Sequence, residues 1–519
     1  MSGRAEHRTG AAYAVEMLNI RKEYPGVVAA DDASLYVKEG EIHGLIGENG
    51  AGKSTMMNIL YGMIKPDRGI IRLYGRDVVI GSPRMAIEHG ISMVHQHFML
   101  MPNMSVLRNV ILGRTPVRRG LIDVAAAKTA IGAIMEEYDL HVDLDSNVYQ
   151  LSVGEKQRVE IIKALYRESR ILILDEPTAV LTPSETNKLM EVLTKLKNQG
   201  RSLIFITHKL REVMALTDNI TVMRRGVVTG RTPKSETEIS ALSTVMVGRE
   251  VDLEIPRKPY RPGECVLDAR GISALNSRGL PALRDVSLTV NRSEIVGIAG
   301  VEGNGQSELV EVIAGMLSPT SGSVIYKGTD ITGTSVRYRR ENGISHVPED
   351  RLRRGVAKTC TVSDNLILNR YYQKGYAKMG IIDNRKLRDL SERLREEFAI
   401  KTPDTGYKLS TLSGGNMQKV VFARETQMIP DLLIAAQPSR GIDIGAMEYI
   451  HGQIIAVRDS GRSVLLVSAE LDEILSLSDR ILVMYEGRIV ARLPRGETDE
   501  REIGEYMMGA RSKDGEACA

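Results

Sequence analysis

The feature that most constrains the fold of this chain is an internal duplication. EIHGLIGENGAGKST at 41–55 aligns with EIVGIAGVEGNGQSE at 294–308, which is an offset of 253 residues. Four further pairs of blocks keep the same order at an offset of 261 residues, and they are 151–160 with 412–421, 171–182 with 432–443, 205–213 with 466–474, and 245–248 with 506–509. The change of offset places about eight extra residues between the first and second blocks of the later copy. A chain that repeats itself in this way is expected to fold into two related domains.

The seam between the two copies lies near 250–263, in a charged segment that contains several prolines. We therefore expect one domain over residues 14–250 and a second over residues 264–510. Short runs rich in Ile and Leu, such as ILILD at 171–175, are typical of strands that are buried on both faces. Such strands alternate here with helical segments, and this alternation predicts an α/β fold with a parallel sheet between helices.

Composition narrows the classes of function without choosing among them. The 69 basic and 66 acidic residues leave a net charge of +3, which is too small to indicate a nucleic-acid partner. Three widely spaced cysteines without a CxxC pair are typical of a reducing compartment and predict neither a disulfide framework nor a zinc site. The first twenty residues lack the apolar core of a secretory signal, and no stretch approaches the ~20 apolar residues of a membrane helix. We therefore expect a soluble chain whose membrane association would depend on a partner.

The segment GENGAGKST has the GxxxxGK[ST] pattern of a phosphate-binding loop, and it lies between an apolar strand segment and a helical one, as that loop requires. Its glycines allow backbone N–H groups to surround phosphate oxygens at the positive end of the helix. Lys53 would supply a positive charge to the β- and γ-phosphates, and the Ser54 hydroxyl would bind Mg²⁺. For this motif alone, a plain glycine-rich turn is the alternative. The predicted ATP-binding loop consists of Gly47, Glu48, Asn49, Gly50, Ala51, Gly52, Lys53, Ser54 and Thr55.

Other side chains with the chemistry of an ATPase follow along the first half. Asp175 ends the apolar segment ILILD and Glu176 follows it; the first can hold Mg²⁺ and the second can polarise an attacking water. Two acids alone would more often mark a surface turn, but a phosphate-binding loop precedes them. His208 can orient the γ-phosphate and the water, although a lone histidine is more often structural. Gln96 can bind Mg²⁺ or the water, and Tyr24 can stack on adenine, yet neither is informative by itself.

The phosphate-binding loop, Gln96, LSVGE, ILILDEP and His208 occur in the order of the ATP-binding cassette (ABC) ATPases, which the chain resembles over almost the whole length of both halves. This resemblance implies two tandem P-loop NTPase domains, each with a parallel-sheet core, an antiparallel β subdomain and a helical subdomain. It also implies ATP as the substrate and Mg²⁺ as the cofactor. In this family, the LSxG signature of one cassette closes on the γ-phosphate bound by the opposing cassette.

The second half keeps the glycines of the loop but has lost most of the reactive groups. Its degenerate loop contains Gly300, Gly303, Gly305, Gln306 and Ser307. The offsets place Gln306, Ala436, Gln437 and Ala469 opposite Lys53, Asp175, Glu176 and His208, respectively. Alignment also places Ser277 opposite Tyr24 and Glu349 opposite Gln96. Because a charged hydrogen bond is worth about 1.5–3 kcal/mol, we expect weakened nucleotide binding rather than none, and without a general base we expect no hydrolysis.

The two signatures are altered in the opposite sense. LSGGN at 412–416 is intact, whereas the first-half signature carries Val153 where a glycine would allow close approach, and Glu155, whose carboxylate would repel phosphate. In the head-to-tail arrangement that the resemblance implies, the intact loop of the first half faces the intact signature of the second. The binding residues of that signature are Ser413, Gly414 and Gly415. All defects then fall in the other composite site, which predicts one catalytic and one silent site.

Smaller motifs narrow the resemblance further. The tandem cassettes, together with HVPEDR, LSGGNMQK and the segments MVG and MMG, resemble the ATPases of sugar and nucleoside importers, most closely the nucleoside branch. This implies ATP-driven uptake of a nucleoside or a simple sugar at the cytoplasmic face of the cell membrane. The implied partners are two integral-membrane permease subunits and a substrate-binding lipoprotein. The apolar stretch after Gln96 would receive a permease helix, although an ordinary loop is an equal alternative.

A soluble tandem ABC ATPase that acts on ribosomes or nucleic acid is the alternative function. Such proteins normally keep both sites intact and carry a long charged linker between the cassettes. Here the linker is short and one site is degenerate. We therefore favour import and expect no nucleic-acid partner.

Overall fold

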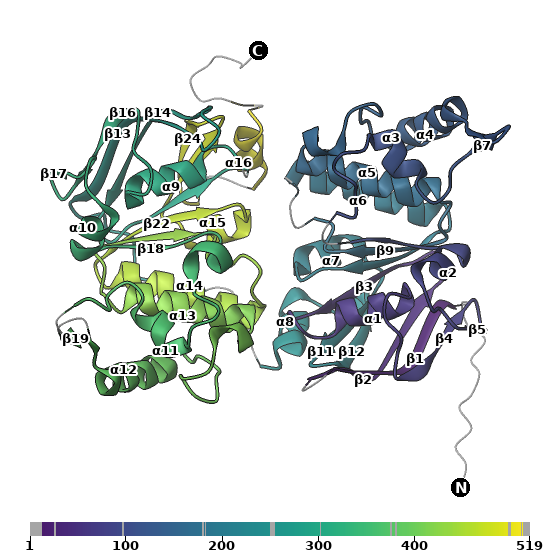
Figure 1. Cartoon of the computed structure of the whole chain (residues 1–519), viewed down its shortest axis with the longest axis horizontal. Helices are drawn as coiled ribbons and strands as arrows, with labels where there is room; N and C mark the ends of the chain where they lie inside the picture. Colours follow the sequence, from purple (N-terminus) through teal and green to yellow (C-terminus); the bar gives the residue numbers. More distant parts are fainter. Residues whose placement is uncertain are drawn as a thin grey trace, which may run out of the picture. The chain divides into compact units, whose positions relative to one another are not determined.

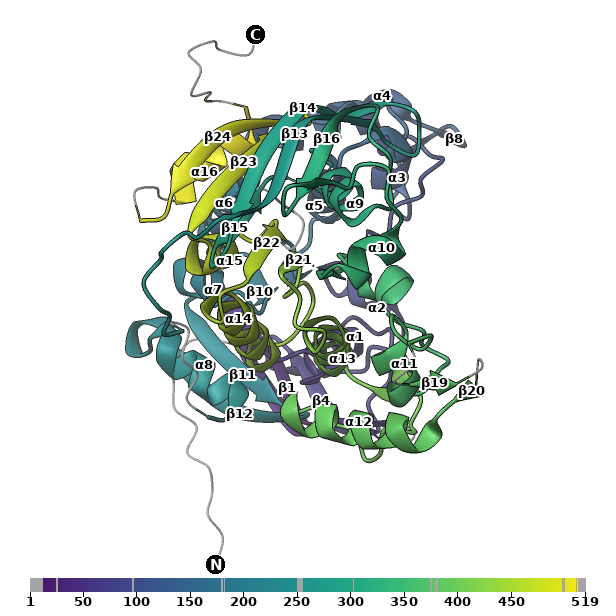
Figure 2. The ribbon, with the colours of Figure 1, turned by 90° about the vertical axis from the view of Figure 1, so that its left-hand side faces the viewer.

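The computed structural model divides the chain into two compact units, unit 1 with residues 1–251 and unit 2 with residues 252–519. The helices and strands of each unit are shown in Figures 1 and 2. The structure describes residues 13–24, 27–95, 98–178, 181, 183–249, 255–301, 303–373, 376–378, 381–496, 500–509 and 511.

Six strands form the central sheet of unit 1. They are β3 (Ile42–Gly47), β6 (Ile91–Val94), β9 (Ile171–Asp175), β10 (Ser202–Ile206), β11 (Asn219–Arg224) and β12 (Val227–Pro233). Their order is β12-β11-β3-β10-β9-β6, and all neighbours are parallel except the antiparallel edge pair β11 and β12. Every residue of β3, β9 and β10 is buried, as expected for strands covered on both faces. The predicted parallel α/β core is thereby confirmed.

A second sheet of unit 1 is entirely antiparallel. Its strands are β1 (Tyr13–Tyr24), β2 (Val27–Lys38), β4 (Arg68–Leu73) and β5 (Arg76–Val78), in the order β2-β1-β4-β5. β1 pairs with β2 from Tyr13 opposite Lys38 to Tyr24 opposite Val27. This is the antiparallel β subdomain that the sequence resemblance implies.

Alternate residues of the central strands point into two different cores. Ile171 and Ile173 of β9 pack with the antiparallel sheet and α1 (Lys53–Leu60), whereas Leu172 and Leu174 pack beneath the helical subdomain on the other face. The separation follows from the opposite directions of successive side chains along a strand. Figure 1 shows α1 and the helical subdomain on opposite sides of β3 and β9.

The helices of unit 1 fall into two groups. The helical subdomain contains α3 (Val106–Ile111), α4 (Val124–Tyr138), α5 (Val153–Tyr166) and the hairpin of β7 (Val117–Arg118) and β8 (Leu121–Ile122). The helices near the sheets are α1, α2 (Pro83–Glu88), α6 (Pro183–Asn198), α7 (Leu210–Leu216) and α8 (Ile239–Val247). Among the described residues of both units, none of the helices has the length and apolar character needed to cross a lipid bilayer.

Unit 2 repeats this architecture strand for strand. Its central sheet has the order β18-β21-β22-β15-β23-β24, with β15 (Ile295–Ala299), β18 (Ile344–Val347), β21 (Leu432–Ala436), β22 (Ser463–Ser468), β23 (Arg480–Tyr485) and β24 (Arg488–Pro494). Its antiparallel sheet has the order β14-β13-β16-β17, with β13 (Cys265–Leu275), β14 (Pro281–Asn291), β16 (Ser321–Tyr326) and β17 (Thr329–Asp330).

The helices of unit 2 also match those of unit 1. The helical subdomain contains α11 (Val362–Ile367), α12 (Asn384–Glu397), α13 (Gly414–Thr426) and the hairpin of β19 (Ala377–Lys378) and β20 (Ile381–Ile382). The other helices are α9 (Gln306–Ala314), α10 (Val336–Glu341), α14 (Ile444–Asp459), α15 (Leu471–Leu477) and α16 (Glu500–Met507). Figure 2 shows α11, α12 and α13 grouped together, away from β13, β14 and β16.

The eight extra residues of the second copy lie in and around the helical subdomain. α11 begins 18 residues after the start of β18, whereas α3 begins 15 residues after the start of β6. The step from α11 to α12 is 22 residues against 18 from α3 to α4, and the step from α12 to α13 is 30 against 29 from α4 to α5. The first of these insertions includes a short π-helix over Arg351–Gly355. The insertions leave the central strands in register with those of unit 1.

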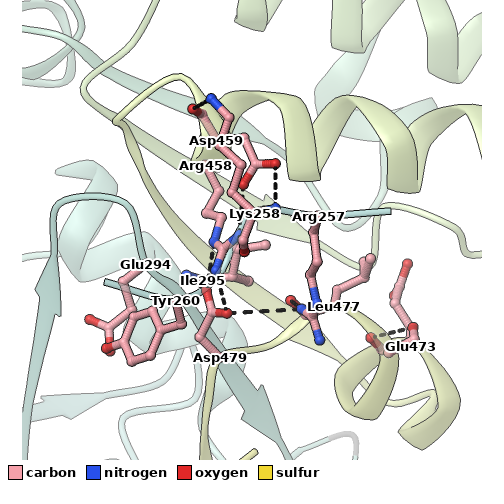
Figure 3. A network of polar contacts seen from close by, with 11 residues as sticks. Arg257, Lys258, Tyr260, Glu294, Ile295, Arg458, Asp459, Glu473, Leu477 and Asp479 are labelled. Carbon is pink, nitrogen blue, oxygen red and sulfur yellow. Dashed lines mark hydrogen bonds and ion pairs between the residues drawn. The ribbon is translucent and has the colours of Figure 1, made fainter. Parts of the chain in front are cut away.

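Residues 257–260, just before β13, are fastened to unit 2 by a network of polar contacts (Figure 3). Arg458 bonds both carboxylate oxygens of Asp479, at 3.1 and 2.9 Å, and donates to the carbonyl oxygen of Lys258 at 2.7 Å. Tyr260 donates to the buried carboxylate of Glu294 at 2.7 Å. Residues 257–260 are therefore an integral part of unit 2.

Candidate functional site

The phosphate-binding loop of unit 1 connects β3 to α1. Gly47 and Gly52 have φ angles of 157° and 102°, and a Cβ atom would lie 2.2 Å from the carbonyl oxygen of Met223 or 2.3 Å from that of Ala29, respectively. Both positions therefore require glycine. Between them, Gly50 has a φ of 82° with open space on its Cβ side. The loop is thus tightly held at its ends and open in its middle, which suits close approach of a phosphate group.

Lys53, at the start of α1, is turned into the loop. Its side chain is buried, and Nζ donates to the carbonyl oxygens of Gly47 at 2.7 Å and Glu48 at 3.0 Å. Burial lowers the pKa of Lys53, against the opposing charges of Glu176, Asp175 and Glu48. A positive charge therefore lies beside the loop, within reach of a phosphate group bound there.

Asp175 lies at the carboxyl end of β9, level with Ile206 of β10. It is 7% exposed, and its carboxylate is hydrogen-bonded to the Ser54 hydroxyl. Burial, and next the negative charge of Glu176, raise the pKa of Asp175, although Ser54 and Lys53 act in the opposite direction. The two acids with one lysine leave this edge of the sheet short of positive charge. Mg²⁺ prefers oxygen ligands such as a hydroxyl and a carboxylate, so Ser54 and Asp175 fit that metal.

Glu176 is held next to His208 by an unusual backbone. Its φ is +47°, and its N–H donates to the carbonyl oxygen of Ile206 at 2.9 Å. The Glu176 Oε1 atom lies 3.0 Å from Nδ1 of His208. Burial acts to raise the pKa of Glu176, but the hydrogen bond and charge of His208, together with the charge of Lys53, outweigh burial and lower the pKa. The carboxylate thus stays ionised, as a general base must be.

Glu212 of α7 joins the loops that carry these groups, and the sequence analysis did not identify it. Its Oε2 atom accepts hydrogen bonds from the hydroxyls of Thr178 at 2.6 Å and Thr207 at 3.3 Å. Thr178 follows Glu176 by two residues, and Thr207 precedes His208. Glu212 aligns with Glu473 in the duplicated blocks, but its bond to Thr178 could not be predicted because it depends on where the tertiary fold places α7.

The remaining predicted groups of the first site lie at its edge. The ring of Tyr24, at the end of β1, is 41% exposed and therefore accessible to a flat ligand. Lys22 Nζ lies 5.7 Å from the centre of that ring. Gln96 follows β6 by two residues and lies outside the described residues.

The loop of unit 2 retains the backbone of the loop of unit 1. Gly305 has φ 101° and ψ 0° before α9, whereas Gly52 has φ 102° and ψ −1° before α1. Gln306 is buried, and its Nε2 donates to the carbonyl oxygen of Val301 at 3.2 Å. A Cβ atom on Gly300 would lie 2.0 Å from this same nitrogen, so the amide is packed against the loop. The backbone of the phosphate-binding loop is therefore preserved in unit 2, but the positive charge that Lys53 supplies in unit 1 is absent.

The strand ends of unit 2 likewise keep the backbone conformation of unit 1 but lack its reactive side chains. Ala436, at the end of β21, offers no oxygen donor where unit 1 has a carboxylate. Gln437 has a φ of +49°, and its N–H donates to the carbonyl oxygen of Val467 at 2.7 Å, as in the corresponding glutamate of unit 1. Its Oε1 accepts a hydrogen bond from the N–H of Ala469 at 3.2 Å. The general base and the histidine are thus replaced by a neutral amide bonded to backbone.

A chain of polar contacts crosses the degenerate site. The Ser307 hydroxyl donates to Oε2 of Glu349 at 2.8 Å, and Oε1 of Glu349 accepts from Nη1 of Arg440 at 2.9 Å. Arg351 then donates to the carbonyl oxygens of Arg440 at 2.5 Å and Gly441 at 3.0 Å. Sequence comparison placed Glu349 opposite Gln96, but it assigned no role to Arg440.

The signature serines cap their helices differently in the two units. In unit 1, Ser152 precedes α5, and Oε2 of Glu155 accepts from its N–H at 2.8 Å and its hydroxyl at 2.7 Å. In unit 2, Ser413 precedes α13, whose first two residues are Gly414 and Gly415, and its hydroxyl accepts from Nδ2 of Asn416 at 2.9 Å. Because an amide donates to it, the hydroxyl of Ser413 keeps its own proton for another acceptor. In unit 1, by contrast, the hydroxyl of Ser152 donates its proton to the carboxylate of Glu155.

The chain is similar to known proteins of the ABC transporter family. The model of the ABC transporter family matches residues 30–179 and again residues 283–440. The chain is 46% identical to the guanosine import ATP-binding protein NupO of Bacillus subtilis, over 97% of this chain and 98% of that protein. It is 45% identical to the glucose import ATP-binding protein TsgD13 of Haloferax volcanii, over 95% of this chain and 96% of that protein.

Among solved structures, the archaeal ribosome recycling factor aABCE1, in a complex with the ribosomal stalk protein aP1, is similar with a TM-score of 0.64. The match covers 95% of this chain and 92% of that chain at 19% identity, so it concerns the fold alone. The two family matches, and relatives that are similar over nearly their whole length, agree with the presence of two phosphate-binding loops. The chain belongs to the ABC transporter family, as an ATP-binding protein with two cassettes in tandem.

Proposed function

We propose that the chain is the ATPase of an importer and that it hydrolyses ATP at only one of two composite sites. The observation that carries this proposal is the cluster of Lys53, Asp175, Glu176 and His208 at one edge of the central sheet of unit 1. The two ABC domains would span residues 14–250 and 264–510.

The reaction would use the residues of unit 1. The oxygen of a water forms a bond to the γ-phosphorus of ATP, the bond from that phosphorus to the β–γ bridging oxygen breaks, and the water proton passes to Glu176. His208 holds the carboxylate and faces the γ-phosphate, while Lys53 binds the β- and γ-phosphates. Mg²⁺, which neutralises phosphate charge when bound, would be held by Ser54 and Asp175 with Gln96.

The second unit would complete this site through its signature. Ser413, Gly414 and Gly415 are proposed to close on the γ-phosphate bound by the loop of unit 1. The Ser413 hydroxyl accepts from Asn416 and, among the described residues, donates to no acceptor, which supports this role because a phosphate oxygen needs a donor. The other composite site would combine Gln306 with the altered signature of unit 1, and it would not hydrolyse ATP.

The partners would be two integral-membrane permease subunits and a substrate-binding lipoprotein, which would place the chain at the cytoplasmic face of the membrane. Met99 and Met101, in the loop before α3, are each 54% exposed, and flexible apolar side chains of this kind suit a docking helix. The transported substrate would be a nucleoside or a simple sugar, since one relative compared above is named for guanosine import and the other for glucose import.

Glu176→Gln tests the catalytic assignment in the full chain with its permease subunits. We expect ATP turnover to fall by about 10²–10⁴-fold, because the base is lost while the loop that binds ATP is intact. ATP should still bind, and uptake of radiolabelled guanosine or glucose into vesicles should stop. As a matched control, Gln437→Glu should leave turnover close to that of the wild type. Substantial hydrolysis by Glu176→Gln would show that the site is misassigned.

A further inference from the structure

Glu212, on α7, connects the two loops that carry the catalytic pair of unit 1. One oxygen of its carboxylate, Oε2, accepts hydrogen bonds from the hydroxyls of Thr178 at 2.6 Å and Thr207 at 3.3 Å. Both threonines are buried, with 1% and 2% of their surface exposed. Hydrogen bonds to a carboxylate are about twice as strong as those between neutral groups. This Glu212 bridge therefore ties the loop after β9 to the loop after β10.

The Glu212 bridge adjoins the contact between Glu176 and His208 along both loops. Thr178 follows Glu176 by two residues, and Thr207 directly precedes His208. Because Glu176 and His208 lie on different loops, the distance of 3.0 Å between Oε1 and Nδ1 depends on how those loops are held relative to each other. The bond from the Glu176 N–H to Ile206 fixes the start of the first loop, and the Glu212 bridge holds the loops together beyond it.

Unit 2 has the same acid but uses it differently. Glu473 aligns with Glu212, yet its Oε1 atom lies 2.8 Å from Nε2 of His451 on α14. Its Oε2 atom is buried and, within the described residues, has no hydrogen-bond partner. The residue of unit 1 that aligns with His451 is Met190, whose side chain has no N–H or O–H group to donate. The aligned acids thus have different partners in the two units.

This difference separates the Glu212 bridge from the backbone conformation of the loops. Gln437, which takes the place of Glu176, has nearly the same positive φ and the same N–H bond to the neighbouring strand. In the described residues of unit 2, however, Glu473 forms no such bridge. The loops therefore reach this backbone conformation without it. The bridge occurs in the unit that has both catalytic side chains, which indicates a role in the reaction rather than in folding.

We propose that Glu212 is a positioning residue for ATP hydrolysis in unit 1, where its carboxylate fixes the separation of Glu176 and His208 through the two threonine hydroxyls. The inference rests on the proposed function, in which Glu176 accepts the proton of the attacking water. Glu212 acts through the threonines and takes no proton itself. A misplacement of about 1 Å in a reacting group lowers a rate by up to about 10²-fold, so loss of such a residue affects kcat.

Glu212→Met tests this role in the full chain with its permease subunits, because methionine is similar in size and its sulfur is only a weak acceptor. We expect kcat to fall by about 10–10²-fold while KM for ATP changes by less than about twofold, since the phosphate-binding loop is untouched. Glu212→Gln keeps an acceptor oxygen and should retain most of the turnover. A rise in KM at unchanged kcat, or a wild-type kcat, would overturn the proposal.

Glu473→Met is the matched control, because it removes the aligned buried acid from unit 2. It breaks the contact with His451 and should lower the unfolding temperature of unit 2. When turnover is measured below both unfolding transitions, its kcat should stay within about twofold of the wild type. An equal loss of kcat in Glu212→Met and Glu473→Met would show that Glu212 acts through stability alone.

Combination with Glu176→Gln gives a readout that a purely structural residue would not produce. If Glu212 acts by placing Glu176, its loss should change the residual turnover of Glu176→Gln by less than about twofold, because the base that it positions is already gone. A further fall of about tenfold or more would contradict the assigned role.

Thr178→Val and Thr207→Val each remove one bond of the Glu212 bridge at nearly constant shape, so they test it even if Glu212→Met does not fold. Each should lower kcat by about three- to tenfold, the value of one hydrogen bond. Wild-type kcat in both variants would refute the proposal. Because Glu176→Gln alone tests the base, such a failure would leave the catalytic assignment standing.

Discussion

Glu176 and Gln437 show how a single residue separates the two units. Both have a φ near +48°, and both donate their N–H to the strand beside them. In unit 1 the side chain is an ionised carboxylate paired with His208, and in unit 2 it is an amide bonded to the N–H of Ala469. The backbone that positions the base has been kept where the base itself is gone.

His208→Ala tests the pairing through the pH dependence of ATP hydrolysis. In the wild type the lowered pKa of Glu176 keeps the base ionised between about pH 5 and 8, so it should not limit kcat/KM there. Without His208, burial acts with less opposition and the pKa of Glu176 rises. The rate should fall by about tenfold or more, and it should decline further as the pH is lowered towards 5. A variant whose pH profile has the wild-type shape would argue against this pairing.

At the scale of elements, buried hydrogen bonds and ion pairs connect the ends of several strands and helices in unit 2. The segment before β13, the end of α14 and the start of β23 meet around Arg458 and Asp479, whose side chains are each 2% exposed (Figure 3). Arg257 also donates to the carbonyl oxygen of Leu477, at the end of α15, at 2.9 Å. Burial raises the pKa of Asp479, while the N–H of Ile295 and the guanidinium of Arg458 oppose the rise. One buried ion pair thus holds together several parts of unit 2.

Arg458→Met should destabilise unit 2 strongly. It leaves Asp479 buried without its main cationic partner, and removing one member of a buried pair costs about 3–5 kcal/mol. The change should lower the temperature of one calorimetric unfolding transition and leave the other in place. Arg393→Met is a matched control on the exposed face of α12, where a surface substitution should change the unfolding free energy by about 0.5 kcal/mol or less. Equal effects of the two variants would show that the network contributes little.

At the scale of the whole molecule, the defects are distributed so that each unit lacks what the other keeps. Unit 1 has the lysine, the carboxylates and the histidine, but its signature serine is engaged by Glu155. Unit 2 lacks those groups, but Ser413 is capped by a neutral amide. Such complementary losses are expected if each composite site takes its loop from one unit and its signature from the other.

Substitution of the signature serines measures this division of labour. Ser413→Arg should reduce ATP hydrolysis by about 10²-fold or more, although unit 2 has no catalytic carboxylate, because a bulky side chain would displace the donor to the γ-phosphate. Ser152→Arg removes the corresponding helix cap from unit 1 and should reduce turnover far less. Turnover should be measured on the full chain with its permease subunits. If Ser152→Arg were the more damaging variant, the proposed pairing of loop and signature would be reversed.

Much of this protein could be predicted from local patterns. The phosphate-binding loop, the buried strands and the duplicated order of motifs predicted the fold of both units, because a loop of fixed glycine spacing between a strand and a helix has few alternatives. The insertions in the second copy were counted in advance and placed between its first and second blocks, but their division among the segments from β18 to α13 was not predicted. Glu212 and Arg440 lie within duplicated blocks but were missed, because their partners Thr178 and Glu349 are 34 and 91 residues away and are brought close only by the tertiary fold.

The sequence by itself determined the two-cassette fold, the position of each phosphate-binding loop and which half had lost its reactive groups, since these depend on residue types at short, fixed spacings. The tertiary structure decided which of those groups meet. Ser307 and Glu349 are 42 residues apart, and Glu349 and Arg440 are 91 apart. They come together because parallel strands end at one edge of a sheet, and the order of strands within that sheet cannot be deduced from local patterns.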